Sequence, residues 1–234
     1  DWQIAVTTTD VSGGNDWEEG RISDFDGNGL HILTSDLYNN DPSGTETLFK
    51  NKVRKRSGNN PLGIPEGSGN ERGIRATAEM IDRALDQMGA QENQHNADFV
   101  RDGAAFVAVV LSDENEGSNG SPNNVLYQPQ QFLDRFNQQF QSQKSLTWHS
   151  IVTMSGDTAC KNVGYSYYGS LYEELSNLTN GVIGSVCDSN YTNILQNIGE
   201  SVADLSKSVS LDCMPLDSNG DGQPDVTVTY EASP

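Results

Sequence analysis

The sequence predicts an α/β protein with a doubly wound, mostly parallel sheet that is flanked by helices. Two observations lead to this prediction. Apolar runs of strand length alternate along the chain with segments whose apolar residues recur at helical spacing. One of these runs, residues 104–113, is apolar over most of its length. Such a run is typical of a strand that helices cover on both faces of a parallel sheet.

Five segments have the composition of strands, because they are rich in β-branched and aromatic residues and end in Gly, Asn, Asp or Ser. The predicted strands cover residues 2–10, 30–35, 104–113, 146–154 and 181–187. From residue 104 onwards a helical segment follows each strand, which is the alternation that parallel pairing requires.

Four segments have helical periodicity. They cover residues 71–88, 128–143, 169–180 and 191–209. In the first of them Ile74, Ala78, Ile81 and Leu85 recur every three or four residues, and Asn70 can cap the start. The predicted α/β domain therefore spans residues 1–209. Residues 210–234 have no helical pattern and form a β-rich appendage or the start of a second domain.

The composition favours a secreted or cell-surface protein. The formal net charge is −19, which argues against a nucleic-acid partner because such partners need a basic face. No segment approaches the roughly 18 apolar residues of a membrane span. The chain begins at Asp1, so we expect any leader peptide to have been removed or omitted.

The chain has three cysteines, Cys160, Cys187 and Cys213. Their spacing lacks the C-x-x-C pairs of a zinc site. Two of them can form a disulfide, which would place the protein in an oxidising compartment, or all three are free thiols in a cytosolic protein. One cysteine is left over if a disulfide forms.

Three carboxylates, Asp113, Glu114 and Glu116, follow the most apolar strand. Ligands of open parallel sheets bind at the carboxyl ends of the strands. We therefore expect this segment to lie at the functional edge of the sheet. The alternative is a loop that is polar only because it is exposed.

Residues 1–209 resemble a von Willebrand factor type A domain. Four segments carry the resemblance: IAVTTTD resembles the family's second strand, and EGSGNERGIRATAEMIDRAL its metal-site loop and following helix. VAVVLSDENE resembles the fourth strand with its metal-site Asp. The segment from WHSIVT to GSVC resembles the strand, helix and turn that follow. The versions that it resembles most occur in bacterial surface and secreted proteins.

The resemblance implies a Mg²⁺ or Ca²⁺ ion at an adhesion site. Asp113 matches the family's Asp, and Ser68, five residues before Gly73, matches its loop Thr. Glu71 is a rival oxygen donor in the same loop. A carboxylate of a partner protein would fill the open position on the ion.

The family's first strand, whose exit carries a D-x-S-x-S motif, has no counterpart ahead of the segment that resembles the second strand; the sequence matches that motif at residues 204–208, inside a predicted helix. Without that strand, we expect its two neighbours to have unpaired edges and exposed apolar faces. The chain is a fragment, or another polypeptide donates the strand, or the sheet is rearranged. The resemblance also implies a disulfide between Cys160 and Cys187, which leaves Cys213 without a partner.

The segment DSNGDGQPD, residues 217–225, predicts a second cation site. Asp217, Asn219, Asp221 and Asp225 alternate in a Gly-containing loop, where their oxygens and the Gln223 carbonyl can converge on one Ca²⁺. The loop resembles the calcium loops of thrombospondin type 3 repeats. We expect it to have a structural role.

The expected function is therefore extracellular adhesion or protein–protein binding, with a protein or cell-surface ligand and a divalent cation. The alternatives are an assembly module of a filament or pilus tip without a ligand-binding metal, and an accessory domain of a secreted hydrolase. The chain has no G-x-S-x-G nucleophile motif and no P-loop, and we predict that it is not an enzyme.

Overall fold

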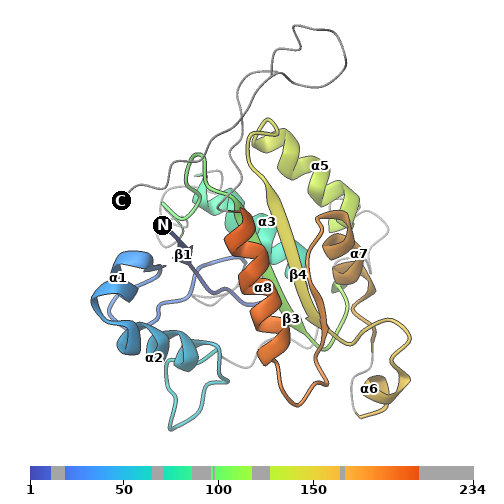
Figure 1. Cartoon of the computed structure of the whole chain (residues 1–234), viewed down its shortest axis with the longest axis horizontal. Helices are drawn as coiled ribbons and strands as arrows, with labels where there is room; N and C mark the ends of the chain where they lie inside the picture. The colour runs from blue at the N-terminus through green and yellow to red at the C-terminus, as the bar shows by residue number, and fades with distance from the viewer. Residues whose placement is uncertain are drawn as a thin grey trace, which may run out of the picture.

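The structure is a computed structural model of the chain. It describes residues 1–11, 19–64, 71–85, 96, 98–117, 127–163 and 167–205. These residues form a mixed α/β fold in which a three-stranded parallel sheet is flanked by helices (Figure 1).

The sheet has the strand order β3 (Phe106–Ser112), β4 (Leu146–Val152) and β5 (Ile183–Ser185), and both pairings are parallel. All seven residues of β4 are buried, because β4 lies between its neighbours and under helices on both faces. The strands predicted from residue 104 onwards are therefore present, with trimmed ends. The predicted burial of β3 on both faces is wrong, since Val109 and Leu111 are exposed.

The four predicted helices are present, and α6 is an additional short helix. The helices of this part of the chain are α3 (Gly73–Ala84), α5 (Pro129–Gln139), α6 (Thr158–Asn162), α7 (Ser170–Leu178) and α8 (Thr192–Leu205). Helices α3, α5 and α7 share one hydrophobic core with β3 and β4. Helix α8 lies on the other face, where Ile194 contacts the backbone of Gly184 in β5 (Figure 1).

The core is centred on Trp148 of β4, which is 1% exposed. Its ring lies 6.0 Å from that of Phe132 in α5 and 6.2 Å from that of Tyr172 in α7. Its indole N–H donates to the Ser150 hydroxyl, so the ring is buried with its polar atom satisfied.

The N-terminal part is less regular than predicted. The strands predicted at 2–10 and 30–35 are reduced to β1 (Gln3–Ile4) and β2 (Leu33–Thr34), which pair antiparallel. Residues 5–10 continue as an extended segment beside residues 19–23, through the Ser23 N–H to Val6 C=O bond of 2.8 Å.

Two helices in this part were not predicted, α1 (Ser35–Asn40) and α2 (Pro42–Lys52). The Thr34 hydroxyl caps α1 and the Asp41 carboxylate caps α2, with Pro42 at the first helical position. A capping residue followed by proline is a helix-start signal, so the sequence contained the information.

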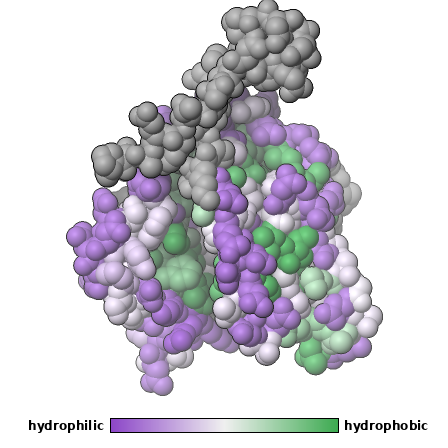
Figure 2. All heavy atoms as spheres, viewed as in Figure 1, coloured by the Kyte–Doolittle hydropathy of each residue, from purple (hydrophilic) through white to green (hydrophobic). Residues whose placement is uncertain are grey.

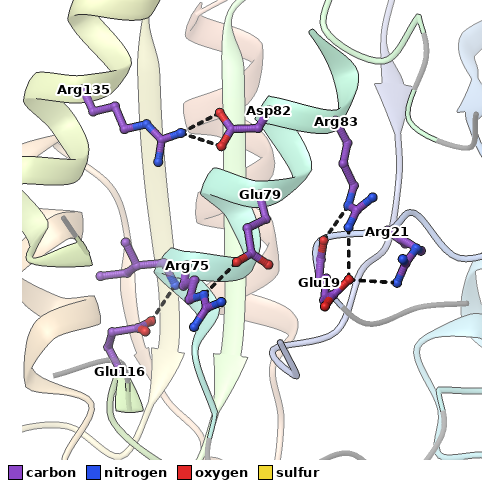
Figure 3. Close-up of polar contacts among 9 residues, drawn as sticks. Glu19, Arg21, Arg75, Glu79, Asp82, Arg83, Glu116 and Arg135 are labelled. Carbon is purple, nitrogen blue, oxygen red and sulfur yellow. Dashed lines mark hydrogen bonds and ion pairs between the residues drawn. The ribbon is translucent and has the colours of Figure 1, made fainter. Parts of the chain in front are cut away.

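Glu19 and Gly20 fix the N-terminal part of the chain to α3. The fully buried Arg83 guanidinium donates to the Glu19 backbone carbonyl at 2.7 Å and lies 3.2 Å from its carboxylate (Figure 3). Gly20 has φ +73°, and a Cβ built on it would lie 2.3 Å from the Met80 backbone nitrogen. Only glycine allows this approach.

A disulfide joins Cys160 in α6 to Cys187 after β5, as the resemblance implies. Cys213 and the predicted segment 210–234 lie outside the described residues. No helix among the described residues has the length and apolar composition needed to cross a membrane.

We expect Gly20→Ala to lower the free energy of unfolding by more than 2 kcal/mol, roughly the cost of overpacking plus a left-handed backbone at a non-glycine residue. Gly29→Ala is the matched control, because Gly29 also has positive φ (+101°) but has nothing within 4 Å of a built Cβ. Urea denaturation of both variants measures the difference. Equal losses would show that the contact with α3 contributes nothing.

We expect Cys160→Ser with Cys187→Ser to cost about 3 kcal/mol, because the disulfide closes a loop between residues 27 positions apart. Urea denaturation of the double variant and of the reduced wild type should give the same loss. A variant as stable as the oxidised wild type would contradict this expectation.

Candidate functional site

The candidate site lies at the carboxyl edge of the parallel sheet, where β3 ends at Ser112. The loop from residue 113 to 117 leaves the sheet there and passes the start of α3. The Gly117 N–H donates to the Glu71 carbonyl at 2.7 Å, which joins this loop to the segment before α3. Glu71 and Asp113, from two distant parts of the chain, therefore belong to one edge.

Glu71 is a partly buried carboxyl group of this edge. Its carboxylate accepts a hydrogen bond from the Ser112 hydroxyl. Burial raises the pKa of Glu71, the Ser112 hydrogen bond lowers it, and the charges of Asp113 and Glu114 raise it further, with a net rise. The edge thus holds a partly buried carboxylate beside two like charges.

Glu116 has a different role. It is 3% exposed, and its Oε2 accepts from the Ile74 N–H at 2.7 Å (Figure 3). Arg72, at the N-cap of α3, makes no side-chain capping hydrogen bond. Glu116 therefore acts as the cap of α3, although it belongs to another loop. It supplies a hydrogen-bond acceptor and a negative charge, and both stabilise the N-terminus of a helix.

Tyr172 of α7 completes the same helix end. Its hydroxyl oxygen accepts from the Gly73 N–H at 2.9 Å. Burial raises the pKa of Tyr172, and the nearby Glu116 charge raises it further. Helices α3 and α7 and the loop after β3 are thus held at one point.

Asn115 and Ser155 fix two loops of this edge to α7 by three hydrogen bonds. The Asn115 Oδ1 accepts from the Leu171 N–H at 3.0 Å, and its Nδ2 donates to the Ser170 hydroxyl at 3.1 Å. In the loop after β4, the Ser155 N–H donates to the Glu173 carboxylate at 3.0 Å. The sequence analysis did not predict a role for these residues. The one sequence feature that could have indicated it is Asn115, an uncharged residue between Glu114 and Glu116.

The predicted site residues have different outcomes. Asp113 lies at the predicted edge, near Glu71, the rival donor. Ser68 and the whole calcium loop, residues 217–225, lie outside the described residues, so their roles remain predictions. In the part of the chain that the structure describes, no group of three or more His, Cys, Asp or Glu side chains is placed to hold a metal ion.

The chain matches no protein-family model, no curated protein and no solved structure. Membership of the von Willebrand factor type A family is therefore a hypothesis that rests on the order and spacing of the four sequence segments.

The two glutamates of this edge should respond in opposite directions to neutralisation. In buffer without divalent cations, we expect Glu71→Gln to raise the free energy of unfolding, because it removes a buried charge beside like charges and keeps an acceptor for Ser112. We expect Glu116→Gln to lower it, because a carboxylate is lost from a helix N-terminus. Each change should be on the order of 1 kcal/mol.

Urea denaturation at neutral pH measures both effects, each against wild type. A loss of stability in Glu71→Gln would mean that a positive charge compensates Glu71 and that the edge has no surplus of negative charge.

Proposed function

We propose that the chain is an extracellular protein-binding domain of the von Willebrand factor type A kind, and that a divalent cation at the carboxyl edge of the sheet takes part in binding. The observation that carries the proposal is the surplus of negative charge around Glu71. Its carboxylate is partly buried, and the charges that raise its pKa are those of Asp113 and Glu114. Such a group is costly to ionise unless a cation compensates it.

The chemistry of the donors fits Mg²⁺ or Ca²⁺, which prefer oxygen ligands. Glu71 and Asp113 supply carboxylates and Ser112 a hydroxyl, but these described residues make only part of a coordination shell. Ser68 remains the proposed additional ligand from this chain. A carboxylate of the partner would complete the shell, and the ion would offset its repulsion from a domain of net charge −19.

The arrangement of the helices supports the doubly wound fold that this function presupposes. Helices lie on both faces of the parallel sheet, and the candidate edge is at the carboxyl ends of the strands, where such folds bind ligands. The disulfide Cys160–Cys187 supports an extracellular location, since disulfides persist in oxidising compartments.

A second Ca²⁺ is proposed for the loop of Asp217, Asn219, Asp221, the Gln223 carbonyl and Asp225, with a structural role. Its support is the sequence alone, because alternating oxygen donors in a Gly-containing loop are the usual arrangement of such sites.

Native mass spectrometry after dialysis into Ca²⁺ and Mg²⁺ tests both sites. We expect two bound ions, one lost in Asp113→Asn and the other in Asp221→Ala. The control is Asp36→Asn, which removes one exposed carboxylate from α1 and should lose neither ion.

If Asp113→Asn binds as many ions as wild type, the carboxyl edge is not a cation site and this proposed function is wrong. Loss of an ion in Asp36→Asn as well would mean that the ions are bound unspecifically by the acidic surface.

A further inference from the structure

Strand β3 is an edge strand of the parallel sheet, and among the described residues no strand pairs with its outer edge. The Phe106 N–H donates to the Ser145 C=O at 2.9 Å, and the register continues in steps of two. In a parallel pair the intervening residues direct their N–H and C=O groups to the opposite edge. These residues are Val107, Val109 and Leu111, and their outer-edge groups have no partner strand among the described residues.

The side chains of the same strand positions are uncovered. Val109 is 50% and Leu111 57% exposed, although both lie in the centre of the sequence's most apolar run. On this face Ile194 of α8 contacts Gly184 of β5, and His149 and Ile151 of β4 are buried. An apolar, uncharged and unpaired strand edge is rare in isolated domains, because other chains pair with it.

Residues 2–10, called here the N-terminal segment, have an unpaired edge in the same way as β3, among the described residues. The Trp2 and Val6 carbonyls accept from the Ser35 and Ser23 N–H groups, so the even-numbered residues pair on that side. The backbone of Ala5 and Thr7 is directed to the other side, where no hydrogen bond to them is present among the described residues.

Side-chain atoms of the same segment are also unsatisfied. Gln3 Oε1 and Thr7 Oγ1 are buried and have no hydrogen-bond partner among the described residues. A buried polar atom without a partner costs free energy, so the segment lacks donors that a neighbouring chain could supply.

The unpaired edges of the N-terminal segment and of β3 both approach the start of α3. Ala5 packs against the core that contains Phe106 and Val110. At the carboxyl end of the sheet, the Arg72 N–H donates to the Thr9 carbonyl at 2.9 Å, and a Cβ built on Gly73 would lie 3.1 Å from Val110 Cγ2. Arg72 and Gly73, which are consecutive in sequence, therefore connect the N-terminal segment to β3.

Two strands that flank a third lie about 10 Å apart, so an additional strand here requires that separation between residues 2–10 and β3. The N-terminal segment reaches the carboxyl edge where Thr9 is hydrogen-bonded to Arg72, and β3 reaches it where Ser112 is hydrogen-bonded to Glu71. Both therefore run towards the same edge, so one strand could pair with both. Figure 2 shows apolar surface on the floor of a recess between α8 and the side of the molecule that carries α1 and α2.

We propose that another polypeptide inserts an extended, uncharged segment between the N-terminal segment and β3 and pairs with both edges. A second copy of this chain is a poor fit, because its β3 has one free edge and the recess needs a strand free on both. Alternate side chains of the inserted segment must be apolar to cover Val109 and Leu111. Those facing α3 must be small, and a hydroxyl among them would donate to Thr7 Oγ1.

The inference goes beyond the cation site and does not depend on it. A display selection of random dodecapeptides on the oxidised protein in EDTA tests it. We expect the enriched peptides to be uncharged and rich in β-branched residues. Their binding should be at least tenfold weaker in the double variant Val109→Asp, Leu111→Asp, which should fold because both side chains are exposed. Leu195→Asp, on the exposed side of α8, is the control and should bind like wild type.

Two measurements on an enriched peptide examine the geometry. Hydrogen exchange should slow at the amides of Ala5, Thr7, Val107, Val109 and Leu111 when the peptide binds. N-methylation should weaken binding at both odd and even central positions, because both edges of the inserted strand are used. Sensitivity at only one set of alternate positions would mean pairing with a single edge and would overturn the insertion.

Three other outcomes would also overturn the proposal. No peptide is enriched, or the enriched peptides leave these amides unprotected, or light scattering shows a dimer that the double variant abolishes. Asp113→Asn should bind the peptide like wild type, which separates this result from the failure or success of the cation site.

Discussion

The rest of the described fold depends on the packing of β4 between its two neighbours and under helices on both faces. Every residue of β4 is buried, and Trp148 fills the space between α5 and α7. This strand fixes the direction of β3 and β5, and so decides which loops gather at the carboxyl edge. Because that edge is set by a rigid core, the loop that follows β3 can carry several carboxylates without disturbing the fold.

At this edge the same kind of side chain has two opposite functions. Glu116 is buried against the N-terminus of α3, where backbone N–H groups favour its negative charge. Glu71 is partly buried among other carboxylates, and its environment disfavours the charge. The first glutamate stabilises the frame, and the second carries a charge that its like-charged neighbours disfavour, which is the basis of the proposed cation site. A count of acidic residues in the sequence cannot separate these roles, because the separation depends on which backbone donors lie nearby.

Sequence reasoning located the central elements well and the peripheral ones poorly. Strands β3 and β4 and helices α3 and α5 have long apolar patterns, and the core that they form preserves those patterns. The segment 2–10 was predicted as one strand but pairs regularly over only two residues, since strand length depends on partners that the sequence does not identify. Helices α1 and α2 were missed because polar composition outweighed their capping signals. The position of Asp113 was predictable from strand order, whereas the role of Glu116 required the contact with Ile74, a residue 42 positions away.

The disulfide has a mechanical consequence. Cys160 and Cys187 enclose α7 and β5 in a covalent loop, so a pulling force transmitted along the backbone bypasses the 27-residue interval between them. That interval, about 90 Å when fully extended, cannot contribute to lengthening of the chain. If α8 and the N-terminal part were pulled apart, the load would fall on contacts outside this loop, such as the pairing of β3 with β4, while α7 and β5 would stay inside the loop. Stretching of the chain would therefore leave α7 and β5 within one covalent loop, whatever happens to the strand pairing around them.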